Sequence, residues 1–88
     1  MEDEAYLVWN GERIWSGTMR GGATRDLNVV RLMENPTGVI QLFDEDEIGQ
    51  DDLLGSGTIR LSDEAGQVEF SGEGEYALTY RLAPIQIP

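Results

Sequence analysis

The sequence contains no cysteine, no histidine and no lysine. No disulfide can therefore support the fold, and the thiolate and imidazole ligands of ordinary zinc sites are missing. Cys–His and Ser–His catalytic pairs are excluded for the same reason, so we expect a protein that is not an enzyme. No apolar run approaches the roughly 18 residues of a membrane span. The acidic start MEDEAYLVW is unlike a signal peptide, which favours the cytoplasm while leaving the compartment open.

Positive charge is also scarce, because six arginines stand against seventeen acidic residues and the formal net charge is −11. A field of this sign repels nucleic acid and anionic membranes, so we expect no nucleic-acid partner and only weak membrane contact. The same field attracts cations and basic partners, and it also keeps a small domain soluble. We expect Arg20, Arg25 and Arg31 to pair with nearby acids rather than to form an anion site.

Turn signals divide the 88 residues into short apolar segments. A chain of this length forms one domain, residues 1–88, because there is no room for two hydrophobic cores. The spacing of the turns is typical of an all-β protein, and we predict an antiparallel β-sandwich of about seven short strands. The expected strands are residues 5–9, 12–16, Leu27–Met33, Gly38–Phe43, Gly57–Leu61, Gln67–Phe70 and Glu75–Leu82.

Two segments carry the clearest strand signals. Asn10-Gly11 tolerates the positive φ angles of a two-residue turn and predicts a hairpin between AYLVW and ERIWS. Between Glu75 and Leu82 the large apolar residues alternate with small or polar ones, which predicts a half-buried strand. The NPTG turn at residues 35–38 predicts a second hairpin, and VIQLF, apolar on both faces, is typical of a central strand. We expect Trp9 and Trp15 to pack in the core or across strands.

The acids are concentrated in one place: six of the seventeen lie within residues 44–52, DEDEIGQDD. Carboxylates held close together repel, so a fold that gathers them must spread them into water or neutralise them. Calcium is a natural neutraliser because it accepts six to eight oxygen ligands in flexible geometry. The EF-hand spacing does not explain the run, because Ile48 and Gly55 stand where that loop needs ligands and the flanks are strand-like.

A second pattern fits this region better. The stretch VIQLFDEDEIGQDDLLGSGTIRL resembles the third calcium-binding loop of C2 domains, with an apolar strand, D-x-D, a later aspartate, two apolar residues and a glycine. EAYLVWNGERIW is similar to an early strand and hairpin of that family, and GEYALTYRL is similar to its closing strand. The resemblance covers about residues 4–82 and implies a C2-like β-sandwich that binds calcium and contacts a membrane or a protein.

The resemblance also implies a set of metal ligands. Three aspartates would supply carboxylates, two loop residues would supply backbone carbonyls, and one glutamate stands where the family has an aspartate in its first loop. In this sequence they are Asp44, Asp46 and Asp52, then Glu45 and Gln50, and finally Glu4. The side chains of Glu45, Glu47 and Asp51 would point outward and raise the local field without coordinating.

The chain departs from the family in ways that affect partners. It starts where the second strand of a C2 domain starts, so a sheet would lack one strand near AYLVW. An open edge of this kind is a template for pairing, and we expect a homodimer or a protein partner there, with the tail Ile85–Ile87 as a lesser alternative. The leading hypothesis is a calcium-binding C2-like module. The alternative is a metal-independent interaction module whose acids serve solubility or a basic partner.

Overall fold

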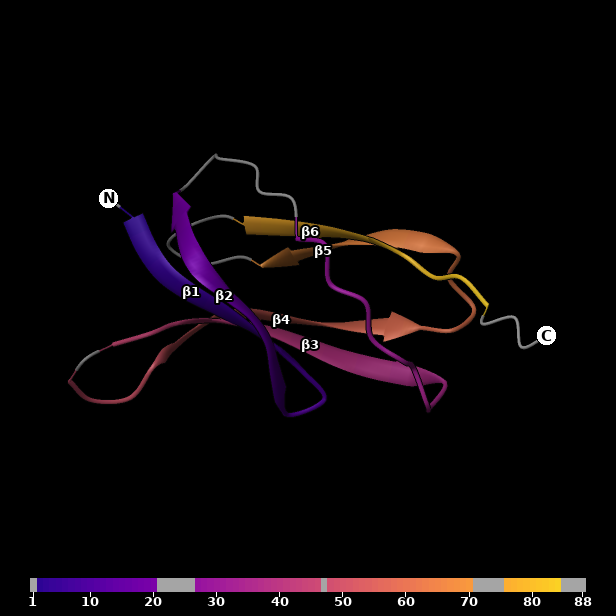
Figure 1. The fold of residues 1–88 in the computed structure, drawn as a ribbon, viewed down its shortest axis with the longest axis horizontal. Coiled ribbons are helices and arrows are strands. Elements are labelled where there is room, and N and C mark those ends of the chain that lie inside the picture. The colour runs from indigo at the N-terminus through magenta and orange to yellow at the C-terminus, as the bar shows by residue number, and fades with distance from the viewer. Residues whose placement is uncertain (1, 21–26, 47, 71–75, 85–88) are drawn as a thin grey trace.

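The computed structural model describes residues 2–20, 27–46, 48–70 and 76–84, and these contain six strands and no helix. Four strands form one antiparallel sheet in the order β2-β1-β3-β4, and two form a second antiparallel sheet (Figure 1). Their bounds are β1 Glu2–Trp9, β2 Glu12–Arg20, β3 Thr37–Asp44, β4 Asp52–Arg60, β5 Ala65–Phe70 and β6 Tyr76–Arg81. The predicted all-β antiparallel class is therefore confirmed. Within these residues, nothing forms a helix long and apolar enough to cross a membrane.

The first hairpin forms as predicted. Asn10 and Gly11 both have positive φ, at 48° and 85°, which suits a tight turn between β1 and β2. The turn is also tied to β3: Asn10 N donates to the Val39 carbonyl at 2.9 Å, and Val39 N donates to Asn10 Oδ1 at 2.8 Å. Asn10 thus fixes the hairpin against the central strand as well as closing it.

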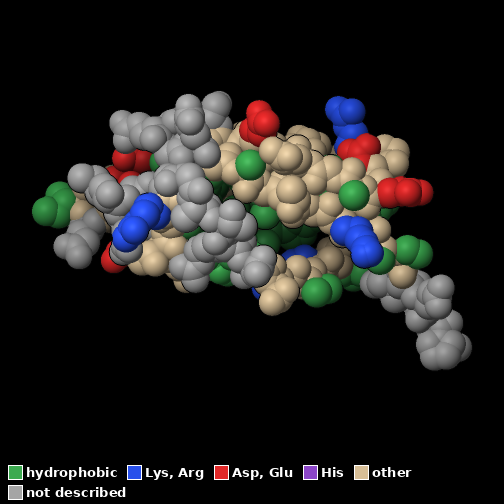
Figure 2. Space-filling model, turned by 90° about the horizontal axis from the view of Figure 1, so that it is seen from above, with side chains coloured by type: hydrophobic (Ala, Val, Ile, Leu, Met, Phe, Trp, Pro, Cys, Tyr) green, Lys and Arg blue, Asp and Glu red, His purple; other side chains and the backbone are tan. Residues whose placement is uncertain are grey.

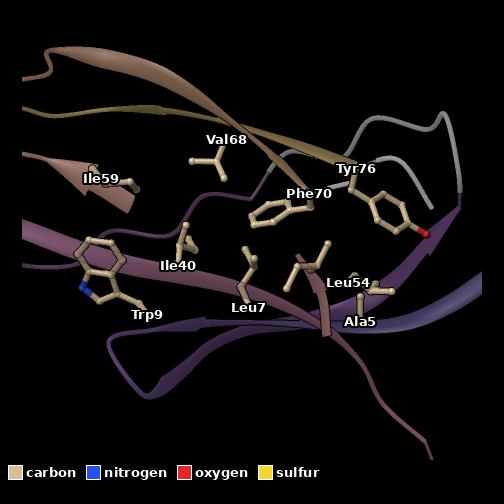
Figure 3. Packing of buried hydrophobic residues seen from close by; sticks show 10 residues of the cluster. Ala5, Leu7, Trp9, Ile40, Leu54, Ile59, Val68, Phe70 and Tyr76 are labelled. Atoms are coloured by element: carbon tan, nitrogen blue, oxygen red, sulfur yellow. The ribbon is translucent and has the colours of Figure 1, made fainter. Parts of the chain in front are cut away.

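The hydrophobic core lies between the two sheets. Side chains of β1, β3 and β4 form one layer, and Val68, Phe70 and Tyr76 of β5 and β6 form the other (Figure 3). Trp9 is buried in this cluster and Trp15 packs against it half-buried, as expected for both. Leu42 is among the most deeply buried residues and belongs to β3, the central strand that VIQLF predicted.

Two glycines of β4 allow the sheets to approach closely. A Cβ atom at Gly55 would lie 2.5 Å from Cβ of Phe70, and one at Gly57 would lie 2.3 Å from a methyl group of Val68. Real Cβ atoms do not reach such distances, so β5 can lie directly over β4 only because these positions lack side chains.

One predicted strand does not form. Residues Leu27–Met33 are not in a strand, so the second hairpin at NPTG is wrong, and the described residues form six strands where about seven were expected. Leu27 and Met33 still pack on the core through their side chains, which explains the apolar pattern. Within the described chain, the backbone of this segment joins no ladder and makes local bonds instead: Val29 N donates to the Leu27 carbonyl at 2.6 Å, and the Arg31 side chain donates to the Val30 carbonyl at 2.9 Å.

Two other expectations are tested. The last strand is confirmed over Tyr76–Arg81, since the side chains of Tyr76, Leu78 and Tyr80 turn inward while Ala77, Thr79 and Arg81 are exposed. The placement of an open edge at AYLVW is wrong, because β1 pairs with β2 on one side and β3 on the other. The tail residues 85–87 lie outside the described residues.

Candidate metal centre

The acidic loop connects two paired strands, and this pairing brings two of the predicted ligands together. β3 ends at Asp44 and β4 begins at Asp52, and these two residues are register partners in the ladder. β4 starts five residues earlier than the predicted strand at Gly57, so the run Leu53-Leu54-Gly55 lies within the strand. The ladder therefore sets the separation of Asp44 and Asp52, and the chain then turns at Gly49, whose φ is 94°.

Asp46 completes a cluster of three carboxylates. One carboxylate oxygen from each of Asp44, Asp46 and Asp52 lies within 4.8 Å of the others. Ca²⁺ binds oxygen at about 2.3–2.6 Å, so two ligands of one ion can be up to about 5 Å apart. The cluster thus has a spacing that a single calcium ion can bridge. None of the three residues is buried, so an ion and its remaining waters can reach them from solvent.

The electrostatics of the cluster favour a neutralising group. The pKa of Asp46 is raised above its ordinary value, first by loss of solvation, then by the negative charges of Asp52 and Asp51 and by a hydrogen bond with the Asp52 side chain. Asp46 is therefore easier to protonate than a free aspartate. A proton relieves part of the repulsion in this cluster, and a divalent cation relieves more of it.

Asp51 has a different role from the outward-facing one expected. Its Oδ2 accepts a hydrogen bond from Tyr6 Oη at 2.5 Å, and its Oδ1 accepts one from the backbone N–H of Asp46 at 3.0 Å. These hydrogen bonds, with a smaller contribution from the charge of Arg13, hold the pKa of Asp51 below its ordinary value. Asp51 thus connects β1 to the loop and fixes the backbone beside Asp46.

Tyr6 is itself held in place on the outer face of the four-stranded sheet. Its ring stacks on Phe43 of β3 with centroids 5.2 Å apart, and the guanidinium carbon of Arg13 lies 3.7 Å above its centroid. Arg13 also forms an ion pair with Glu45 at 3.9 Å, and both side chains are about half exposed, at 47% and 49%. Tyr6, Phe43 and Arg13 therefore form one packed group beside the acidic loop.

The remaining predicted ligands are not part of the carboxylate cluster. Glu4 lies beside it on β1, where its backbone carbonyl accepts a hydrogen bond from Glu45 N at 2.7 Å, and its side chain is exposed. The Glu45 side chain points outward as expected, and Gln50 is exposed. Coordination by the carbonyls of Glu45 and Gln50 stays a prediction. Glu47 lies outside the described residues.

Sequence reasoning missed the Tyr6–Asp51 contact, and no pattern in the sequence shows it. In AYLVW the alternation places Tyr6 on the face opposite Ala5 and Leu7, and yet Tyr6 is buried. A buried tyrosine hydroxyl needs a hydrogen-bond partner. The partner lies 45 residues away, in a loop whose path the local sequence does not define.

The chain was compared with protein-family models, with curated proteins and with solved structures, and none of the three comparisons found a match.

Proposed function

We propose that this chain is a non-enzymatic calcium-binding module that uses the loop at residues 44–52. The observation that carries the proposal is the convergence of the Asp44, Asp46 and Asp52 carboxylates within 4.8 Å of one another. Hard oxygen ligands at this spacing suit calcium, which accepts carboxylates, carbonyls and waters together. Soft-metal chemistry lacks its usual ligands, since the sequence has neither cysteine nor histidine.

The support beneath the loop adds to the proposal. Asp51 bonds to the backbone beside Asp46, and Tyr6 holds Asp51, so the position of Asp46 is partly fixed before any ion arrives. A preorganised site loses less conformational entropy on binding. The remaining cost of the free site is lost solvation together with carboxylate repulsion, which both raise the pKa of Asp46, and a bound cation removes the repulsion.

Calcium would then regulate association with a membrane or protein partner. Ile48 lies at the tip of the loop and is 93% exposed. An ion bound beside it would cancel local negative charge and let this side chain approach an anionic or apolar surface. As the resemblance to C2 domains implies, the loop would be the contact region.

A thermal melt tests the proposal. A ligand that binds only the folded chain raises the melting temperature, and at about ten times its dissociation constant it stabilises by about 1.4 kcal/mol, or about 6–11 °C for a domain of this size. We expect calcium to produce such a shift and magnesium a smaller one. Asp44→Asn should abolish the calcium shift, whereas Glu69→Gln, which removes an exposed charge on β5, should keep it. Equal shifts with both ions would contradict the proposal.

A metal-independent interaction module is the second candidate. The specific observation in its favour is that Tyr6, Asp51 and the Asp46 backbone hold the loop together using only groups of the chain itself. In that case the acids serve solubility or a basic partner, and calcium leaves the melting temperature unchanged.

A further inference from the structure

A cavity of about 400 Å³ opens on the side of the molecule opposite the Tyr6 face, and its volume is within the range of ligand-sized sites. Its floor is the inner face of the four-stranded sheet, where Leu7, Trp9, Ile14, Ile40 and Ile59 line it. This floor is accessible because the two-stranded sheet covers only part of the four-stranded one. Figure 2 faces this side and shows apolar side chains at the bottom of a hollow.

The two walls of this cavity come from segments far apart in the sequence. One wall is residues 78–82, the end of β6 and the residue after it, and the other is residues 27–31, which belong to no strand. Successive side chains of a strand point to opposite faces, so the consecutive residues of β6 present their backbone edge to the cavity. The space is therefore a slot between the backbone edge of β6 and the segment 27–31, above an apolar floor, and we call it the β6 slot.

The edge of β6 that faces away from β5 presents backbone hydrogen-bonding groups that pair with no strand of the described residues. Leu82 N donates to the Glu64 carbonyl at 2.8 Å, and Arg81 lies opposite Ala65 in the same ladder. Hydrogen-bonded and non-hydrogen-bonded pairs alternate along an antiparallel ladder. Since Leu82 bonds to the β5 side, Tyr80 and Leu78, which lie two and four residues before it, also bond to β5. The N–H and C=O groups of Thr79 and Arg81 then point to the other side, where no strand of the described chain pairs with β6.

The opposite wall is not a strand. Leu27, Val29 and Met33 are partly buried, but Arg31 and Leu32 are exposed along with Asn28 and Val30, so the alternation of a sheet strand ends at Val30. Val29 N donates to the Leu27 carbonyl at 2.6 Å in a three-residue turn, so part of this backbone is already paired. This wall therefore offers side chains, and the edge of β6 is the one that an added strand can extend.

The charge around the slot differs from that of the rest of the chain. The whole sequence has seventeen acids and six arginines, yet among the described residues that line the slot the charged ones are Arg31 and Arg81. Neither forms an ion pair with a carboxylate of the described residues, and Arg31 instead donates to the Val30 carbonyl at 2.9 Å. An occupant with a carboxylate would therefore find complementary charge here.

We propose that the β6 slot accepts an extended peptide strand from a partner, apolar at alternate positions and carrying an acidic residue at its end. The strand adds to the edge of β6 through Thr79 and Arg81, lays its apolar side chains on Leu7, Trp9 and Ile14, and directs its acid to Arg31 and Arg81. Main-chain hydrogen bonds provide affinity in such β-strand addition, and alternate side chains provide specificity. This interaction is independent of calcium and of the loop at residues 44–52.

The probe is a fluorescein-labelled octapeptide of alternating Val and Thr with glutamate at both ends, and its control has lysine at both ends. Fluorescence anisotropy should show saturable binding of the acidic probe in a calcium chelator, and the basic probe should bind at least about tenfold more weakly. Thr79→Pro removes one edge N–H and should weaken binding about tenfold relative to Thr79→Val, which keeps it.

Hydrogen exchange on the unmodified protein keeps the proposal testable if Thr79→Pro does not fold. The acidic probe should slow exchange at the amides of Thr79 and Arg81, while those of Leu78 and Tyr80 are already protected by β5. No binding, or equal binding to Thr79→Pro and Thr79→Val, would overturn the proposal. The proposal would also be overturned if exchange at the Thr79 amide slows as the protein concentration rises with no probe present. In that case a second copy of the chain fills the slot. If decanoate displaces the labelled peptide and the peptide slows exchange at no amide of β6, the cavity is a small-molecule pocket and the proposal is wrong.

Discussion

Asp46 and Asp51 lie in one loop, and the fold shifts the pKa values of their carboxyl groups in opposite directions. The pKa of Asp46 is raised by lost solvation and by its acidic neighbours, whereas the pKa of Asp51 is lowered by the hydrogen bonds that it accepts. A raised pKa means that Asp46 stabilises the fold below its unfolded pKa and loses this contribution as the pH rises through its folded value. Asp51 contributes above its unfolded pKa and loses that contribution as the pH falls through its folded value.

Replacing Asp46 therefore has a predictable effect. Asp46→Asn mimics the protonated form, so in a calcium chelator at neutral pH it should raise the melting temperature. The gain should shrink as the pH falls, because the wild-type carboxyl becomes protonated. With calcium the order should reverse, since the variant lacks a ligand. Glu69→Gln is the control for loss of one charge, and melts of both variants across pH 3–7 check the prediction. A loss of stability in both buffers would give Asp46 a structural role instead.

The contribution of the Tyr6–Asp51 hydrogen bond to stability can be tested by replacing each partner in turn. Tyr6→Phe keeps the ring on Phe43 and beneath Arg13 but leaves Asp51 with one partner fewer. We expect Tyr6→Phe and Asp51→Asn each to lower the melting temperature at neutral pH, and the double variant to lose less than the sum of the two. Additive losses would mean that the two groups do not interact in solution.

At the scale of the elements, the contact of β4 with β5 depends on its glycines. Gly55→Ala would place a methyl group 2.6 Å from the Phe70 Cα, a backbone atom that cannot move aside easily. Overpacking of this kind costs about 1–3 kcal/mol. Urea unfolding should show this loss, whereas Ser56→Ala, an exposed neighbour on the same strand, should change stability by less than about 0.5 kcal/mol. An unchanged Gly55→Ala would mean that the sheets are further apart.

Local sequence predicts those elements whose hydrogen-bond partners are close along the chain. Asn10-Gly11 specifies its hairpin because the turn and both strands lie within 2–20, and Glu75–Leu82 shows its buried face by alternation alone. Leu27–Met33 is also rich in apolar residues, but within the described residues it pairs with no strand and its exposure does not alternate beyond Val30. The pattern of apolar side chains therefore predicted which residues pack on the core, whereas the pairing of strands depends on residues far away in the sequence.

The same limit applies to the candidate site. The resemblance to C2 domains predicted Asp44, Asp46 and Asp52 together, and the paired strands on either side of one loop do bring these three residues close. Asp51 could not, because its role depends on Tyr6, which belongs to β1. Glu4 reaches the loop through its backbone, and its side chain lies outside the carboxylate cluster.

For the whole molecule, net charge governs long-range behaviour. With a formal charge of −11 and no lysine, the chain should show no binding to anionic vesicles at physiological salt in a chelator. With calcium we expect weak binding, because Ile48 alone would insert and one buried apolar side chain contributes about 1.5–3 kcal/mol. Vesicle sedimentation measures both cases, and Ile48→Ser should abolish the calcium-dependent part. Tight sedimentation in the chelator would contradict the charge argument.

The central claim is that calcium binds at the loop of residues 44–52, and a two-dimensional ¹H–¹⁵N NMR titration tests it most directly. We expect calcium to shift the amide signals of residues 44–52 and of Tyr6 in a saturable way, with the signals of β5 and β6 unchanged. Magnesium at the same concentration should cause smaller shifts in the same residues. Calcium shifts spread evenly over all acidic surfaces, or no shift at Asp44, Asp46 and Asp52, would contradict the claim.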